Sequence, residues 1–128
     1  MAAYFWVALG SALGGAGRYG VGLWSAAWLG TGFPWGTLIV NVLGSFIIGV
    51  FAALSSQVGP ITISDDARLF VTVGLCGGFT TFSAFSLQTL NLVQSGAWAA
   101  AAANIAGSVV LCLVAVWAGY AVAALLAR

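Results

Sequence analysis

The chain has 128 residues, of which 62% are hydrophobic and 4% are charged. So few charged side chains cannot form the polar surface of a soluble domain, so the composition predicts an integral membrane protein embedded in a lipid bilayer. The chain contains no Lys and no His, and its formal net charge is +1. That charge excludes the basic surface by which proteins bind nucleic acid.

Four stretches are long and apolar enough to span the membrane, because a helix crosses about 30 Å of hydrocarbon with roughly 20 residues. They comprise residues 3–28, 36–56, 67–92 and 97–126. The linkers between them are short, which predicts antiparallel neighbours. We therefore predict an all-α protein, with residues 1–128 forming a single membrane domain of four transmembrane helices.

The first stretch carries one charged side chain, Arg18, among several glycines. A guanidinium within a membrane is costly unless it reaches water or a polar partner. We expect Arg18 to lie at a water-filled mouth, where its charge would raise the local anion concentration. Binding to carbonyl groups of a neighbouring helix or loop is an equal and compatible alternative. Gly10 and Gly14 form a small-residue row suited to close helix contact, within the chain or with a second copy.

The second stretch places Thr37 and Asn41 four residues apart, so their side chains share one helical face. An asparagine at membrane depth needs a hydrogen-bond partner. That partner is either another helix, in which case the bond only stabilises the bundle, or a permeating ligand.

The third stretch contains the pair Gly77 and Gly78, followed by Thr80 and Thr81. These residues form a poor helix, so we predict a break at residues 77–80. Backbone carbonyls freed by a break must find new partners, and they suit a small hard cation or a hydrogen-bonded loop. A simple glycine kink that permits close packing is the alternative.

Beyond the break, Phe82, Phe85 and Thr89 recur at the spacing of one helical face, with Ser86 beside them. Two phenylalanines at this spacing also occur in ordinary packing, but the neighbouring hydroxyl groups argue against a purely apolar face. The fourth stretch adds a second polar row. It consists of Asn104, Ser108 and Cys112.

These rows predict a path for an anion. Amide and hydroxyl groups donate hydrogen bonds, and the edge of a phenyl ring carries a positive partial charge. The only acidic residues are Asp65 and Asp66, which we expect in a loop. A small proton-coupled multidrug exporter is the alternative function, but it would need a carboxylate within the membrane. An enzyme is not expected, because no nucleophile has a base within reach.

Two segments carry a family resemblance. Residues 36–46, GTLIVNVLGSF, and residues 77–86, GGFTTFSAFS, are similar to the two signatures of the CrcB/Fluc fluoride channels. The resemblance extends over nearly the whole chain. It implies a multi-pass protein of the cell inner membrane that assembles as an antiparallel, dual-topology homodimer. Two pores at the dimer interface would export cytoplasmic fluoride passively.

The resemblance also implies roles for individual residues. By matching position, Phe82 and Phe85 would contact fluoride through their ring edges, Asn41 would donate an amide N–H to it, and Thr37 would lie nearby. The carbonyl groups of the break, at Gly77 and Thr80 of both subunits, would bind a structural Na⁺.

Further pathway residues follow from the same resemblance. Arg18 would lie in the vestibule. The polar track beyond the phenylalanines would consist of Ser83, Ser86, Thr89, Ser108 and Asn104. Two positions depart from the family pattern, since Gln88 stands where an acidic residue can occur and Asn104 where a Tyr is common. We hypothesise that the Asn104 amide replaces the Tyr hydroxyl as a donor.

Overall fold

A computed structural model of the chain describes residues 1–56 and 62–127, and every regular element in those residues is a helix. The elements in chain order are α1 (Ala2–Leu29), α2 (Trp35–Leu54), α3 (Asp65–Arg68), the π-helix η1 (Leu69–Cys76), α4 (Gly77–Phe79), α5 (Phe82–Gln94) and α6 (Trp98–Leu126). The predicted all-α class is confirmed for this part of the chain.

Three stretches are long and apolar enough to cross a membrane, namely Trp35–Leu54, Asp65–Gln94 and Trp98–Leu126. The helix α1 has 28 residues, but its glycines, its tyrosine and tryptophan residues and Arg18 make it less apolar than these three stretches. The assignment to membrane proteins therefore rests on these three stretches. The fourth span, expected at residues 3–28, stays a prediction.

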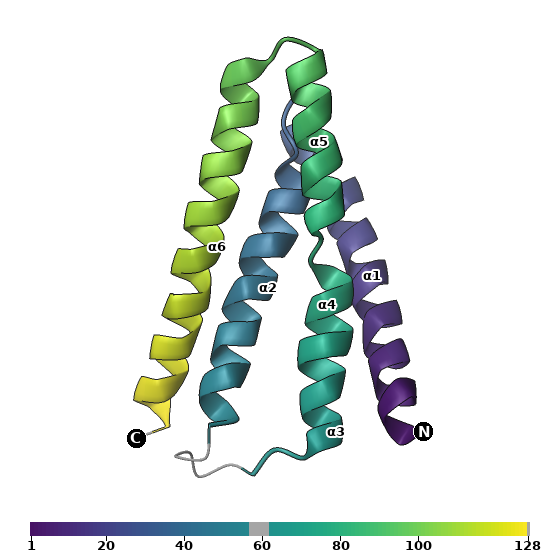
Figure 1. Cartoon of the computed structure of the whole chain (residues 1–128), viewed down its shortest axis with the longest axis vertical. Coiled ribbons are helices and arrows are strands. Elements are labelled where there is room, and N and C mark those ends of the chain that lie inside the picture. The colour runs from purple at the N-terminus through teal and green to yellow at the C-terminus, as the bar shows by residue number, and fades with distance from the viewer. Residues whose placement is uncertain (57–61, 128) are drawn as a thin grey trace.

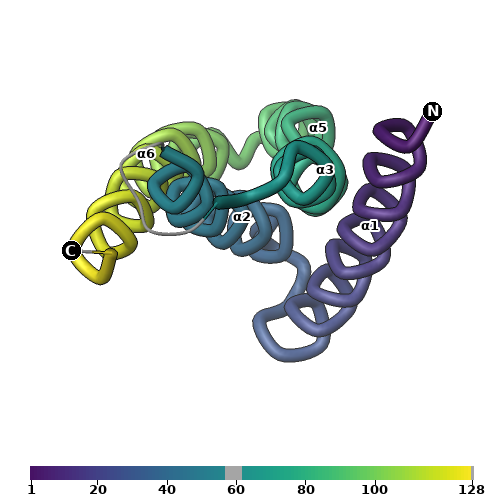
Figure 2. Tube along the Cα trace, turned by 90° about the horizontal axis from the view of Figure 1, so that it is seen from below, coloured from purple at the N-terminus to yellow at the C-terminus, as the bar shows by residue number. Residues whose placement is uncertain are grey.

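The helices run side by side and alternate in direction (Figure 1). The start of α1 and the end of α6 lie at one end of the molecule, and the turns that join α1 to α2 and α5 to α6 lie at the other. Seen from below, the helices form an open arc in which α2 adjoins α6, and the column from α3 to α5 stands between α2 and α1 (Figure 2). The most extensive contacts join α2 to α6 and α1 to η1.

Glycines allow α1 to approach the column closely. Gly10 and Gly14 of α1 are buried against η1 and α4, where they meet Gly74 and Gly78. A Cβ atom added to Gly78 would lie 2.5 Å from the carbonyl oxygen of Ser11, which is closer than real Cβ contacts. The small-residue row of α1 is therefore used within the chain.

The contact between α2 and α6 uses the same principle. Gly49 and Gly119 are both buried, and a Cβ atom on either would lie 3.1 Å from a backbone nitrogen of the facing helix, that of Tyr120 or Val50 respectively. Two backbones at such short range gain many dispersion contacts without needing large side chains.

The column begins earlier than the sequence predicted. Asp65 and Asp66 were expected in a loop, but they form the exposed first turn of α3. Ser64 caps that turn, because its hydroxyl oxygen accepts a hydrogen bond from the backbone N–H of Ala67 at 3.3 Å. Acidic side chains are favourable at this position because the helix N-terminus carries a positive partial charge.

The break in the column lies at Thr80 and Thr81, whose backbones are extended with ψ angles of 160° and 120°. The sequence placed it at residues 77–80, but Gly77 and Gly78 are helical. Gly78 is small because α1 packs against it, and the threonines leave the helix instead. Thr81 then starts α5, since its hydroxyl oxygen accepts from the N–H of Ala84 at 3.1 Å.

Candidate functional site

Asn41 of α2 pairs with the backbone of the break. Its side-chain Nδ2 donates to the carbonyl oxygen of Thr81 at 3.1 Å, and its Oδ1 accepts from the N–H of Thr81 at 2.8 Å. Thr81 is only 8% exposed, so its backbone groups need these partners. The amide of Asn41 therefore replaces the peptide partners that Thr81 lost when the helix broke.

The same geometry frees two carbonyl groups. In an unbroken helix, the carbonyl of Gly77 would accept from the N–H of Thr81, and that of Thr80 from the N–H of Ala84. These N–H groups donate to Asn41 Oδ1 and to Thr81 Oγ1 instead. The structure thus removes the helical donors from the two carbonyls that the family resemblance implies for a cation.

These carbonyls are hard oxygen donors, which suit a cation such as Na⁺. Within residues 1–56 and 62–127, His, Cys, Asp and Glu form no cluster of three or more that could hold a metal ion. The oxygen donors that the break offers to a metal ion are its backbone carbonyls and the hydroxyl groups of Thr80 and Thr81.

At the N-terminal end of α5, Phe82 and Phe85 line a cavity of about 340 Å³, called here the phenylalanine cavity. Phe85 is buried at 9% exposure, Phe82 is 77% exposed, and their ring centroids lie 5.2 Å apart. Polar groups enter this cavity from three elements: α2, the break and α6. Its lining residues are Asn41, Thr80, Thr81, Phe82, Phe85, Ser108, Val109, Cys112 and Leu113.

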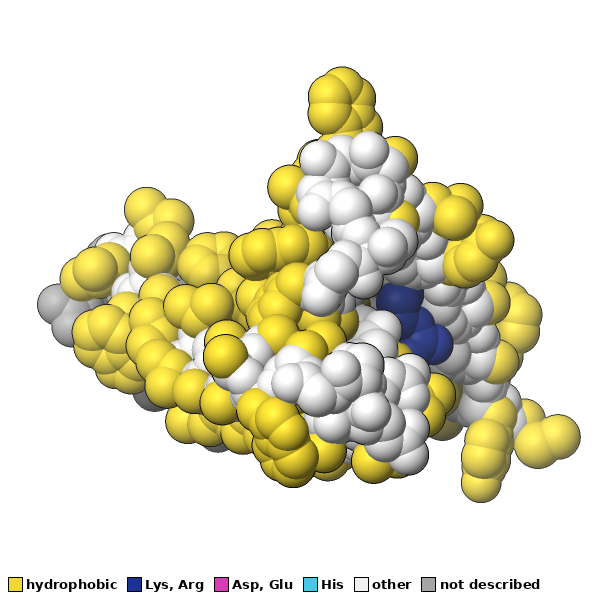
Figure 3. All heavy atoms as spheres, turned by 90° about the horizontal axis from the view of Figure 1, so that it is seen from above, with side chains coloured by type: hydrophobic (Ala, Val, Ile, Leu, Met, Phe, Trp, Pro, Cys, Tyr) yellow, Lys and Arg dark blue, Asp and Glu magenta, His cyan; other side chains and the backbone are white. Residues whose placement is uncertain are grey.

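Arg18 lines a different cavity of about 410 Å³, called here the arginine cavity. Thr37, Thr81 and Ala84 also line it. Seen from above, basic side-chain atoms lie within a hollow between the helices (Figure 3). Thr37 and Asn41 share a helix face but open into separate cavities, and Thr81 lines both of these cavities.

A chain of hydrogen bonds links α6 to α5. Ser108 Oγ donates to Asn104 Oδ1 at 3.4 Å, Asn104 Nδ2 donates to Thr89 Oγ1 at 2.9 Å, and Thr89 Oγ1 donates to the carbonyl of Phe85 at 2.8 Å. Asn104 is 1% exposed. Ser108 and Cys112 of the predicted polar row line the phenylalanine cavity, whereas Asn104 is not among its lining residues.

Ser83 and Ser86 lie on the exposed part of α5. Ser83 Oγ is 3.3 Å from Thr81 Oγ1, and Ser86 Oγ donates to the carbonyl of Phe82 at 2.9 Å. Neither serine is among the described residues that line the phenylalanine cavity. Their role in a polar track stays a prediction.

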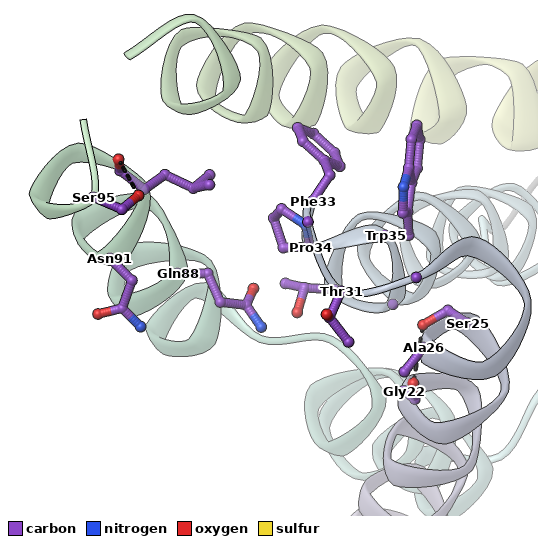
Figure 4. Close-up of a pocket in the computed structure, with 15 residues that line it drawn as sticks. Gly22, Ser25, Ala26, Thr31, Phe33, Pro34, Trp35, Gln88, Asn91 and Ser95 are labelled. Atoms are coloured by element: carbon purple, nitrogen blue, oxygen red, sulfur yellow. Dashed lines mark hydrogen bonds between the residues drawn. The ribbon is translucent and has the colours of Figure 1, made fainter. Parts of the chain in front are cut away.

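A third cavity, of about 590 Å³, lies at the end where α1 turns into α2 (Figure 4). Gln88 and Asn91 of α5 line it together with Ser95, which follows α5, and Gln88 points into it. The Oε1 atom of Gln88 is buried and has no hydrogen-bond partner among residues 1–56 and 62–127. This cavity shares Gly22, Gly36 and Thr37 with the arginine cavity, so the two are neighbours between α1 and α2.

Comparison with known proteins identifies the family of the chain. Residues 5–120 match the family described as CrcB-like protein, Camphor Resistance (CrcB). The chain is 56% identical over 120 residues to a protein of Methylocella silvestris, with 94% of this chain and 92% of that protein covered. It is 54% identical over 120 residues to a protein of Opitutus terrae, covering 94% and 91%.

A protein of Paramagnetospirillum magneticum is 52% identical over 128 residues, with all of both chains covered. All three relatives bear the name fluoride-specific ion channel FluC, so they are named as channels and not as enzymes. Several helices of this chain are long and apolar enough to span a membrane, and the family model matches nearly its whole length. The chain belongs to the CrcB family.

Proposed function

We propose that this protein is a fluoride-selective channel that lowers cytoplasmic fluoride by passive export. The phenylalanine cavity is the observation that carries the proposal. It combines two phenyl rings with hydroxyl groups of Ser108 and the threonines, and with the amide of Asn41. The names of the relatives support fluoride as the ion.

The chemistry of this cavity favours a small anion over a cation. Phenyl ring edges carry a positive partial charge, and hydroxyl and amide groups donate hydrogen bonds. Asn41 Nδ2 carries two hydrogens, of which one is used on Thr81. The second is available to an ion. Such donors are individually weak, so an ion that enters can also leave.

Arg18 serves the same function at a distance. It lines the arginine cavity and not the phenylalanine cavity, so it raises the anion concentration at the mouth without holding an ion at the contact site. Thr37 accompanies it at this mouth. A cation at the narrow point would bind fluoride too firmly for rapid passage.

The working unit in this proposal is an antiparallel, dual-topology homodimer in the cell inner membrane, with two pores at the interface. The 77% exposure of Phe82 in the single chain supports this, because a second copy would cover the ring and close the cavity. A structural Na⁺ would be held by the freed carbonyls of Gly77 and Thr80 from both copies. The positive charge of Na⁺ would there attract the carbonyl groups of both copies and so hold the two breaks together.

Fluoride efflux from proteoliposomes tests the proposal. Purified protein is reconstituted into vesicles loaded with potassium fluoride or potassium chloride, and efflux is started with a potassium ionophore. We expect rapid fluoride release and chloride release at the level of protein-free vesicles. Equal rates for the two anions, or no fluoride release, would refute the proposed function.

A further inference from the structure

The helix α5 carries both phenylalanines and is held at two points by asparagine side chains. At its N-terminal end, Asn41 of α2 binds the backbone of Thr81. Two turns later, Asn104 of α6 binds Thr89. Phe82 and Phe85 lie between these two points, so the position of α5 at both points determines where the rings lie.

The second attachment leads directly to Phe85. Thr89 Oγ1 accepts from Asn104 Nδ2 at 2.9 Å and donates its own hydrogen to the carbonyl of Phe85 at 2.8 Å. Among the described residues, this is the side-chain hydrogen bond that joins α5 to α6. The remaining contact between these two helices is sparse compared with that between α2 and α6.

The geometry of Asn104 does not suit direct contact with an ion. The residue is 1% exposed and lines none of the three cavities described here, and its amide donates to Thr89 through Nδ2 and accepts from Ser108 through Oδ1. The bond from Ser108 is the longer of the two, at 3.4 Å. Ser108 itself lines the phenylalanine cavity, so Asn104 also orients a hydroxyl group of that cavity.

We propose that Asn104 is a positioning residue, which holds Phe85 through Thr89 and orients Ser108, and that it does not bind fluoride itself. The inference rests on the proposed fluoride channel. It assigns to Asn104 a different role from that of a donor on the ion path. An amide is suited to this role because it donates and accepts at once, and so links two helices and a hydroxyl group in one chain.

A double-mutant cycle tests the inference. The variants are Asn104→Leu, Thr89→Val and the double variant, with Ala106→Leu as the control because Ala106 is exposed on the opposite side of α6. Limiting fluoride flux and the concentration of half-maximal flux are measured in proteoliposomes. The unfolding equilibrium of each variant is measured in detergent, which gives a readout that does not need fluoride flux.

We expect Asn104→Leu to lower the limiting flux at least about threefold, the factor that corresponds to an average interhelical hydrogen bond. The half-maximal concentration should stay the same, because the ion does not touch the amide. In the Thr89→Val background the same change should have a smaller effect on flux and on unfolding, because only the bond from Ser108 is left to lose. Ala106→Leu should leave both unchanged.

Two results would overturn the inference. If the effects of Asn104→Leu and Thr89→Val on flux are additive, Asn104 does not act through Thr89. If Asn104→Leu raises the half-maximal concentration, the amide acts on the ion. If the parent carries no fluoride, the proposed function fails, and the unfolding cycle alone decides: non-additive effects support the link between Asn104 and Thr89, and additive effects refute it.

Discussion

Replacement of Asn41 by leucine should destabilise the protein through the break in the column. Leucine has a similar size and suits an apolar helix, so the change removes two hydrogen bonds and little else. The N–H of Thr81 loses its acceptor at 2.8 Å, and the carbonyl of Thr81 loses its donor at 3.1 Å. Thr81 is 8% exposed, so water cannot freely replace these two hydrogen-bond partners.

The size of the effect follows from the two orphaned groups. A buried backbone group without a partner costs about 1–3 kcal/mol. Measured hydrogen bonds between membrane helices average about 0.6 kcal/mol, because the unfolded chain also finds partners. Thr81 borders two cavities, so water can reach it in part. We therefore expect the free energy of unfolding to fall by about 2 kcal/mol, near the lower end of the range for two orphaned groups. This corresponds to about a 30-fold shift of the unfolding equilibrium.

Reversible unfolding in mixed micelles, followed by the fluorescence of the six tryptophans, measures this loss. The matched control is Asn91→Leu, which removes an exposed amide from α5 and should change the free energy of unfolding by less than about 0.5 kcal/mol. An Asn41→Leu variant as stable as the parent, or a control that is equally destabilised, would refute the role given to Asn41.

Three further outcomes are expected. Gly78→Ala should reduce stability by about 1–3 kcal/mol in the same unfolding assay, because its Cβ would lie 2.5 Å from the carbonyl oxygen of Ser11, whereas Gly20→Ala has open space and should be neutral. Phe85→Leu should lower fluoride efflux about threefold to tenfold, since it removes a ring edge from the cavity; unchanged efflux would contradict the role of that ring. Arg18→Gln should lower efflux about tenfold at low salt and less at 1 M salt, and a loss independent of salt would contradict the electrostatic role of Arg18.

The helical class and the antiparallel order of the helices followed from the sequence. Composition and short linkers are sufficient for this, because a chain in lipid must satisfy its backbone within helices. The break was also foreseen, since paired glycines and paired threonines both disfavour a helix. Its position was shifted, because the sequence does not reveal that Gly78 faces α1 and must remain helical to do so.

The partners of the polar side chains could not be predicted. Asn41 and Thr81 are 40 residues apart, and Thr89 and Asn104 are 15 residues apart on different helices. The sequence showed that each asparagine needs a partner, but several hydroxyl and carbonyl groups were possible. Which of them lies opposite depends on helix rotation, and eight residues of π-helix in η1 change that rotation ahead of the break.

The break in the column suits both proposed ion sites because its two sides carry opposite partial charges. In the helical segment that ends at Phe79, the carbonyl of Gly77 has lost its helical donor, and the C-terminal end of the segment is the negative end of the helix dipole. The helix α5 begins at Phe82 with its N–H groups and the positive end of its dipole beside the phenylalanine cavity. Broken membrane helices generally bind ions through such half-helix ends. Asn41 satisfies the peptide groups of Thr81 between them, so the carbonyl side stays suited to Na⁺ while the α5 side stays suited to fluoride. The two proposed sites therefore use different groups of one short segment and do not compete.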